Sequence, residues 1–145
     1  MSERTADAGE VWPVVVIGAG AAGLMAAAFA AAAGARVLVL ERTRTGGKKI
    51  VVSGGGRCNV LPSVAAPERS VTDSSPNTLR KLLLAWPLDA QRRYFEDVLH
   101  LPLVLEAESG KLFPASQRAT DVRGVLLNRA HRRGAALGYH ARVTA

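Results

Sequence analysis

Three glycines near the start of the chain have the spacing of a phosphate-binding loop. Residues 18–23 read Gly-Ala-Gly-Ala-Ala-Gly, the pattern G-x-G-x-x-G. In this pattern the first glycine permits a tight turn after a strand, the second lets a pyrophosphate approach the backbone, and the third lets the next helix lie close to the strand. The start of that helix offers free N–H groups and the positive end of its dipole. The residues that we assign to this loop as cofactor contacts are Ile17, Gly18, Gly20, Ala21, Ala22 and Gly23.

An acidic residue follows the glycines at the distance that dinucleotide sites require. Glu41 lies close to the expected spacing of about 20 residues beyond the loop. Its carboxylate can accept hydrogen bonds from a ribose diol and would repel a 2′-phosphate, so NADP is disfavoured at this position. The alternative interpretation is that the glycines serve helix packing and that Glu41 is a solvated strand end. The spacing alone does not separate NAD from FAD.

The elements around the loop have the pattern of a βαβ unit. We predict a strand at 12–17, a helix at 21–33 and a strand at 36–41, which together have the length of such a unit. The first strand is apolar throughout, as in strands that are buried on both faces of a parallel sheet. The sequence therefore predicts an α/β fold with a Rossmann-like parallel sheet.

The same region is long enough to raise the possibility of a membrane segment. No charged residue occurs from Val11 to Ala35, and a helix needs about 20 apolar residues to span a bilayer. However, glycines and a proline interrupt this segment, and acidic residues precede it where a signal peptide would be basic. We therefore expect no membrane segment. Since no targeting signal is visible, we expect a cytoplasmic protein, and the single cysteine agrees with that location.

Composition and periodicity divide the rest of the chain. The predicted segments are a flexible N-terminus at 1–10, a folded domain at 11–145 that begins with the βαβ unit at 12–41, a glycine-rich loop at 42–76 with one short helix, helices at 77–100, a strand and turn at 101–118, and a helix and strand at 119–145. Asn77 is a candidate helix cap, and the final strand is expected to run from Leu137 to Val143.

Composition also narrows the possible partners and metals. The chain has 145 residues, a net charge of +7 and 5% aromatic residues. Its basic residues are dispersed, with few aromatics to stack bases, so we expect no nucleic-acid partner. A single cysteine excludes a redox dithiol within the chain, and His100, His131 and His140 do not have the spacing of metal ligands. We therefore predict no metal site.

A second glycine-rich segment lies at 47–60. Its three adjacent glycines, Gly54 to Gly56, permit a close approach to a flat ligand or a phosphate, and Arg57 could neutralise a pyrophosphate. The alternative is a flexible surface loop with a solvated arginine. Gly47-Lys48-Lys49 lacks the Ser or Thr of an ATP-binding P-loop. Cys58 as a nucleophile would need a base or a lowered pKa, so we favour a structural thiol.

These motifs resemble the HI0933-like flavoproteins, also called the BaiN/RdsA family of NAD(P)/FAD-dependent oxidoreductases. Three segments carry the resemblance: residues 16–25, the segment 47–60 with its sequence SGGGRCNV, and the segment 110–116 with the sequence GKLFPAS. The second and third segments are more specific than the first, which many FAD proteins share. Their order along the chain is that of the family.

The resemblance implies an FAD-binding domain of the two-dinucleotide-binding-domain type, present here incompletely. The adenosine ribose would lie on Glu41, the pyrophosphate on residues 18–23, and the backbone of Val143 beside the adenine. The Ser53–Asn59 loop would pass near the pyrophosphate or the flavin end. The further cofactor contacts implied in this way are Arg42, Lys48, Gly54, Gly55, Gly56, Arg57, Cys58 and Asn59.

The activity implied by the resemblance is flavin-mediated hydride or electron transfer, with NAD(P)H or the substrate as the donor. The small-molecule substrate, the acceptor, the catalytic acid or base and the oligomeric state stay open. Family members are much longer, and they usually have Thr-Asn where Leu61-Pro62 stand here. Two alternatives therefore remain: a truncated, inactive nucleotide-binding remnant, and an NAD-binding dehydrogenase domain.

Overall fold

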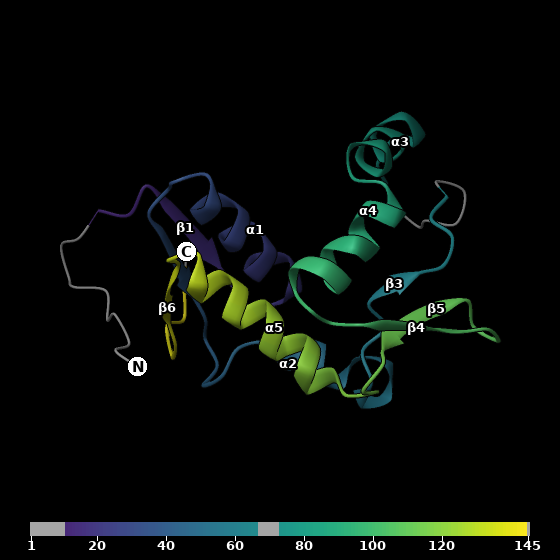
Figure 1. The fold of residues 1–145 in the computed structure, drawn as a ribbon. Coiled ribbons are helices and arrows are strands. Elements are labelled where there is room, and N and C mark those ends of the chain that lie inside the picture. The colour runs from purple at the N-terminus through teal and green to yellow at the C-terminus, as the bar shows by residue number, and fades with distance from the viewer. Residues whose placement is uncertain (1–10, 67–72, 145) are drawn as a thin grey trace.

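The computed structural model describes residues 11–66 and 73–144. The predicted flexible N-terminus at 1–10 lies outside the described residues. Figure 1 shows a parallel sheet toward one end of the structure and an antiparallel sheet toward the other, with helices beside each. The elements are β1 (Val14–Ile17), α1 (Ala21–Ala32), β2 (Val37–Leu40), α2 (Lys48–Val52), η1 (Ser53–Gly56), β3 (Leu61–Pro62), α3 (Pro76–Ala85), α4 (Leu88–Arg93), η3 (Tyr94–Val98), β4 (Leu103–Glu106), β5 (Lys111–Pro114), α5 (Ala119–Arg132) and β6 (Ala136–Gly138).

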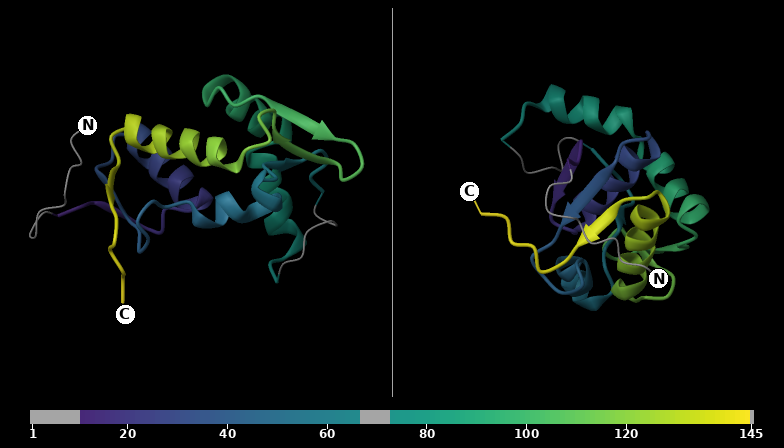
Figure 2. Two further views of the ribbon diagram at one scale, coloured as in Figure 1. Left: turned by 90° about the horizontal axis from the view of Figure 1, so that it is seen from below. Right: turned by 90° about the vertical axis from the view of Figure 1, so that its left-hand side faces the viewer.

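The parallel sheet confirms the predicted Rossmann-like architecture. Its strand order is β1-β2-β6, and both pairs are parallel. The register places Val14 beside Val37 and Leu38 beside Ala136. The right-hand view of Figure 2 shows these strands side by side. Because parallel strands need crossover connections, α1 links β1 to β2, and α5 leads into β6.

Helices α1 and α5 pack against each other and cover the sheet. The face of α5 that is buried follows the helical spacing predicted from the sequence, with Val122, Leu126 and Ala130 in the core. Alanines Ala27 and Ala28 of α1 are also buried, and their small side chains let the two helices approach closely. The apolar core therefore lies between these two helices and the parallel sheet.

The first strand differs from its prediction. Its burial alternates, and Val15 and Ile17 are 48% and 70% exposed. The prediction of a strand buried on both faces is wrong, because α1 packs against β1 on the face that carries Val14 and Val16, whereas the face that carries Val15 and Ile17 is exposed. An unbroken apolar sequence is therefore compatible here with a strand that has one open face.

The second sheet is antiparallel and has the order β3-β5-β4. A hairpin joins β4 to β5, with Leu105 opposite Leu112, and β3 adds to the other edge of β5. The segment predicted as a loop at 42–76 contains α2, η1 and β3, so it is more ordered than expected. Its last part falls on residues 67–72, which lie outside the described residues.

Two element boundaries also differ from the prediction. The cap of α3 is Ser75, whose Oγ accepts a hydrogen bond from the Thr78 N–H at 3.2 Å, and not Asn77. Strand β6 ends at Gly138, well before Val143, because His140 adopts φ 56° and turns the chain. His140 therefore does not lie on a strand.

Candidate functional site

The first glycine turn connects β1 to α1 and is fixed by its backbone. The Gly18 N–H donates to the Leu40 carbonyl at 2.8 Å, so the turn begins against the end of β2. Gly18 has φ 95°, a conformation that favours glycine. A Cβ on Gly23 would collide with the Gly18 carbonyl oxygen. The helix can therefore approach the strand this closely only with glycine at position 23.

The space in front of α1 is open. Gly20 is the N-cap of this helix and has an extended backbone, and a Cβ added to it would meet no atom within 4 Å. The first turn of α1 contains no acidic side chain. The N–H groups at this end are therefore accessible to an anion, and they carry the positive end of the helix dipole.

Glu41 connects the end of β2 to the glycine turn. Its carboxylate is buried, and its Oε2 accepts a hydrogen bond from the Ala19 N–H at 2.7 Å. Its Oε1 accepts from the N–H and the Oγ1 of Thr43 at 2.8 and 2.7 Å. A carboxylate has about four acceptor positions, and three are used here. One position therefore remains for a ribose hydroxyl group. Glu41 is therefore not the solvated strand end of the alternative interpretation.

The surroundings of Glu41 favour its ionised form. Burial by itself raises the pKa of this carboxyl group. The hydrogen bonds from Thr43 and Ala19 outweigh burial, and the charge of Arg42 acts in the same direction. The net effect is a pKa below the usual glutamate value. The carboxylate is therefore an acceptor at neutral pH, as recognition of a hydroxyl group requires.

The chain after β6 runs along the same acidic residue. The Glu41 N–H donates to the Gly138 carbonyl at 2.8 Å, and the Ala141 N–H donates to the Glu41 carbonyl at 2.9 Å. Val143 follows two residues later, outside any strand, with an exposed side chain. The structure thus places residues 138–141 beside the candidate ribose site, while the proposed adenine contact of Val143 stays a prediction.

The second glycine-rich segment begins directly on the first turn. The Gly47 N–H donates to the Ala19 carbonyl at 2.8 Å. A Cβ on Gly46 would lie 2.9 Å from the Cβ of Ala19, and one on Gly47 would lie 2.5 Å from the Cγ of Arg123. Helix α2 starts immediately afterwards with the exposed residue Lys48. Two segments that the sequence separates are therefore in contact, with Lys48 next to their junction.

The end of this segment forms a second glycine turn at 53–59. Four of its residues have left-handed backbones: Gly54, Gly55, Gly56 and Cys58, with φ of 55°, 66°, 86° and 63°. The glycines are exposed, whereas Cys58 is buried, as expected of a structural thiol. Its Sγ lies 3.9 Å from the Asn59 carbonyl oxygen.

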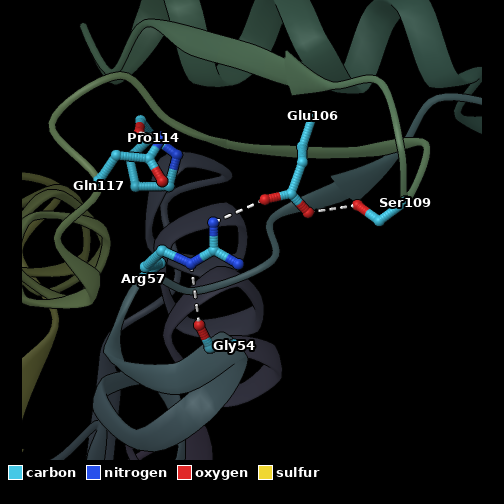
Figure 3. A network of polar contacts seen from close by, with 6 residues as sticks. All are labelled: Gly54, Arg57, Glu106, Ser109, Pro114 and Gln117. Carbon is cyan, nitrogen blue, oxygen red and sulfur yellow. Dashed lines mark hydrogen bonds and ion pairs between the residues drawn. The ribbon is translucent and has the colours of Figure 1, made fainter.

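Arg57 lies between this turn and the β4–β5 hairpin (Figure 3). Its Nη1 is 2.7 Å from Glu106 Oε1, and its guanidinium group lies 4.3 Å from the centre of the Phe113 ring. Its Nε donates to the Gly54 carbonyl at 3.4 Å. The Ser109 hydroxyl donates to Glu106 Oε2 at 2.6 Å. The positive charge that was predicted to neutralise a pyrophosphate is thus paired with a carboxylate within the chain.

Glu106 is ionised in this arrangement. The hydrogen bond from Ser109 has the largest effect and lowers the pKa of Glu106, and the hydrogen bond and charge of Arg57 lower it further. Both groups of the ion pair are partly exposed, at 42% for Arg57 and 35% for Glu106. The pair is therefore formed at neutral pH and remains in contact with solvent.

Several residues that shape the site were not found from the sequence. Ala19 lies at a variable position of the first glycine motif, and Thr43 and Arg123 lie outside the motifs. Glu106 and Phe113 are far from Arg57 in sequence, although Phe113 belongs to the third family motif at 110–116. The predicted strand and turn at 101–118 indicated the hairpin but not its contact with Arg57.

Other candidate chemistry is limited in the described residues. They contain no group of three or more His, Cys, Asp or Glu side chains that could hold a metal ion. No helix within 11–66 and 73–144 is long and apolar enough to cross a membrane.

His100 has φ 53° after the helical turn that ends at Leu99, which is a helix-terminating position. Phe29, Trp86 and Tyr94 form an aromatic cluster with ring centres 5.5–6.0 Å apart, so they join helices rather than line a cofactor site.

The geometry fits a dinucleotide. The open N-terminus of α1 suits a pyrophosphate, the carboxylate of Glu41 suits a ribose diol, and both meet at Ala19. A substituent at Gly20 would occupy the space in front of the helix, where no protein atom lies. The roles predicted for residues 18–23 and Glu41 in cofactor binding stay predictions.

Comparisons with known proteins identify the family. Residues 12–145 match the HI0933-like protein Rossmann domain. A ribosomal RNA dihydrouridine synthase of Escherichia coli is 50% identical over 50 residues, which are 34% of this chain and 12% of that protein. A 3-dehydro-bile acid delta(4,6)-reductase of Clostridium scindens is 32% identical over 113 residues, which are 77% of this chain and 27% of that protein. The chain thus spans only a minor part of the length of these curated relatives.

Solved structures agree on the fold. A 3-ketosteroid-delta4-(5alpha)-dehydrogenase from Rhodococcus jostii has a TM-score of 0.63 and 19% identity, covering all of this chain and 42% of that chain. THI4 from Thermovibrio ammonificans has a TM-score of 0.57 and 18% identity, covering 88% of this chain and 38% of that chain. At these identities the likeness establishes the Rossmann-type fold. Because the matched family domain extends over residues 12–145, the protein belongs to the HI0933-like family.

Proposed function

We propose that this chain binds FAD and forms the N-terminal, cofactor-binding portion of a flavin-dependent oxidoreductase. The adenosine ribose would lie on Glu41, and the pyrophosphate would lie at the start of α1. The flavin would supply hydride or electron transfer, with NAD(P)H or the substrate as the donor. The residues described here would bind and orient the cofactor.

One observation carries this proposal: the carboxylate of Glu41 reaches the phosphate-binding turn directly. The 2.7 Å hydrogen bond from the Ala19 N–H supports the proposal, because it holds a carboxylate that could accept a ribose hydroxyl beside the open N-terminus of α1. The two halves of a ribose–pyrophosphate unit therefore have adjacent partners. Without this contact, the glycines would indicate only a close helix–strand packing.

Family membership and the second glycine turn favour FAD over NAD. The C. scindens relative is by name a reductase, and it matches 77% of this chain. The segment from Gly47 to Asn59 extends from the first turn, and NAD recognition by a βαβ unit does not require such an extension. Lys48 lies at its start and is the exposed cation that we assign to the pyrophosphate. The cytoplasmic location and the lack of a nucleic-acid partner stay predictions from the sequence.

Binding can be tested with a matched pair of variants. The purified chain is titrated with FAD, and the quenching of flavin fluorescence is measured, with NAD in a parallel titration. Gly20→Ala places a methyl group where the pyrophosphate would approach, and we expect it to weaken FAD binding about tenfold. Gly124→Ala is the control, because that glycine also has open space around its Cβ position but lies on α5.

The possible outcomes are distinct. Saturable FAD binding that only Gly20→Ala weakens supports the proposal. Preferential binding of NAD would instead indicate an NAD-binding dehydrogenase domain. A folded chain, with a cooperative thermal transition, that binds neither nucleotide would contradict the proposal.

A further inference from the structure

The second glycine turn has a conformation that its own sequence does not stabilise. Three consecutive glycines and Cys58 have positive φ. Glycines lose more conformational entropy on folding than other residues do, and a non-glycine residue with a left-handed backbone is strained. Such a turn keeps one shape only when contacts from outside it favour that shape.

The hydrogen bonds inside the turn do not fix its position in the molecule. The Cys58 N–H donates to the Ser53 carbonyl at 3.1 Å, and the Arg57 N–H donates to the Gly54 carbonyl at 3.3 Å. Both bonds join residues of the same turn. They close the loop, but they would move with it as a unit.

Arg57 supplies contacts that link the turn to the rest of the protein. On one side, its guanidinium group bonds to Glu106 at the end of β4 and lies over the ring of Phe113 on β5. On the other side, its Nε bonds back to the Gly54 carbonyl. Phe113 also supports Gly54, because a Cβ on that glycine would lie 3.2 Å from the ring. Figure 3 shows the resulting series from Ser109 through Glu106 and Arg57 to Gly54.

The charge balance indicates the role of Arg57. A phosphate-binding arginine needs an uncompensated positive charge, whereas Arg57 has a carboxylate at 2.7 Å. The carboxylate is itself held by the Ser109 hydroxyl at 2.6 Å. This arrangement fixes a side chain in one geometry. It does not increase the positive charge of the site.

We propose that Arg57 is a positioning residue, which through Glu106 and Phe113 holds the turn at 53–59 in the shape that contacts the cofactor. The part of this inference that concerns FAD binding rests on the proposed function. Backbone bonds anchor both ends of the segment, from the Gly47 N–H to the Ala19 carbonyl and from the Val60 N–H to the Leu112 carbonyl. The Arg57 contacts set the position of the turn between these two anchors. Arg57 thus acts on FAD through backbone placement.

The experiment separates positioning from direct phosphate binding. Arg57→Ala, Glu106→Ala and the double variant are compared by amide hydrogen exchange at 53–59 without FAD and by FAD affinity. We expect each single variant to accelerate exchange and to weaken FAD binding to a similar extent, by about fivefold to tenfold. The double variant should be no worse than the single variants, because both remove the same interaction. Arg93→Ala, which removes the exposed Arg93–Asp89 pair at 2.9 Å, is the control.

A further measurement detects a purely structural effect. At saturating FAD, the visible circular dichroism of the bound flavin should change in Arg57→Ala while the melting temperature of the chain changes little. The double variant with swapped charges, Arg57→Glu with Glu106→Arg, should restore part of the protection against amide hydrogen exchange, since the ion pair can form again. Lack of any such restoration, together with additive single effects, would count against a pair that works as a unit.

Two results would overturn the inference. The first is weak FAD binding in Arg57→Ala with unchanged exchange at 53–59 and normal binding in Glu106→Ala, which would make Arg57 a direct phosphate ligand. The second is unchanged exchange in all variants. If the parent chain bound no FAD, the proposed function would fail, but the exchange measurements would still decide whether Arg57 holds the turn.

Discussion

The two glycine turns of this protein are stabilised in different ways. In the turn at 18–23, backbone packing requires the glycine at position 23, and the acid that completes the site is bonded directly to the turn. In the turn at 53–59, the glycines are exposed, and side chains from a distant hairpin hold the turn in place. The first turn is therefore part of the folding core, whereas the second depends on contacts that can change without unfolding the domain.

The sharpest test of this difference compares one glycine from each turn. Gly23→Ala should destabilise the chain by about 3 kcal/mol, because the added methyl group collides with the Gly18 carbonyl and the backbone must move. Gly55→Ala should cost only about 1 kcal/mol, because its Cβ meets no atom and only the positive φ opposes it. Urea unfolding of both variants gives the two free energies. Equal costs would show that the first turn is not more tightly packed than the second.

Glu41→Gln should have the next largest effect. The amide replaces a buried, ionised acceptor of three hydrogen bonds, and bonds to charged groups contribute about 1.5–3 kcal/mol each when one is lost. The amide can keep part of these bonds, so we expect a loss near the lower end of that range, together with weaker FAD binding. The readouts are urea unfolding and FAD titration, with Glu108→Gln on the exposed hairpin tip as the control.

The sign of the pH dependence follows from the lowered pKa of Glu41. The unfolded glutamate has a pKa of about 4.3, and the folded value is lower. The stabilisation by the ionised carboxylate is therefore complete above the unfolded value and is lost as the pH falls through the folded value. The difference in stability between the parent chain and Glu41→Gln should shrink as the pH falls below about 4. A difference that is constant from neutral to acidic pH would show that the charge has no part in it.

Lys48→Ala should reduce FAD affinity through charge alone. Lys48 is exposed at the start of α2, next to the contact between Gly47 and Ala19. We expect a loss of about fivefold at low salt, which becomes smaller as added salt screens the charge. Lys81→Ala, on α3, is the matched control, since that helix has no buried residues. An effect of Lys48→Ala that is independent of salt would point to a change in the turn rather than in the electrostatic attraction.

The sequence predicted the first turn better than the second for a physical reason. The roles of Gly23 and Glu41 depend on a local strand–turn–helix unit and on one neighbouring strand, so their spacing contains the necessary information. The partner of Arg57 is Glu106, which reaches it only because the hairpin of β4 and β5 folds back over the turn. No local pattern encodes that contact. An exposed arginine after three glycines was therefore assigned to a phosphate, although in the structure it is paired with a carboxylate.

The same distinction between local pattern and distant contact explains why the predictions for β1 and β6 were wrong. The burial of β1 and the length of β6 depend on what lies beside each strand, and neither is a property of the strand's own residues. An apolar run at 12–17 predicts a strand, but only the packing of α1 on one face of β1 decides that Ile17, on the other face, is exposed. Likewise, β6 ends at Gly138 because His140 beyond it has a left-handed backbone, although the Ala141 N–H still bonds to the Glu41 carbonyl.

The smallest expected effect concerns the Ser109 hydroxyl group, which bonds to the Glu106 carboxylate of the ion pair with Arg57. Ser109 has the largest part in lowering the pKa of Glu106, so Ser109→Ala should raise that pKa. Since a depressed carboxyl pKa gives a stabilisation that is lost as the pH falls through the folded value, the variant should lose exchange protection at 53–59 at a higher pH than the parent chain. Protection of α1 next to the first turn should stay the same, because the carboxylate of Glu41 is bonded to Ala19 and Thr43, which lie outside this hairpin. Ser116→Ala, an exposed serine beyond β5, is the control. A shift at both turns would mean that the hairpin stabilises the whole domain, and the contrast between the two turns would then be lost.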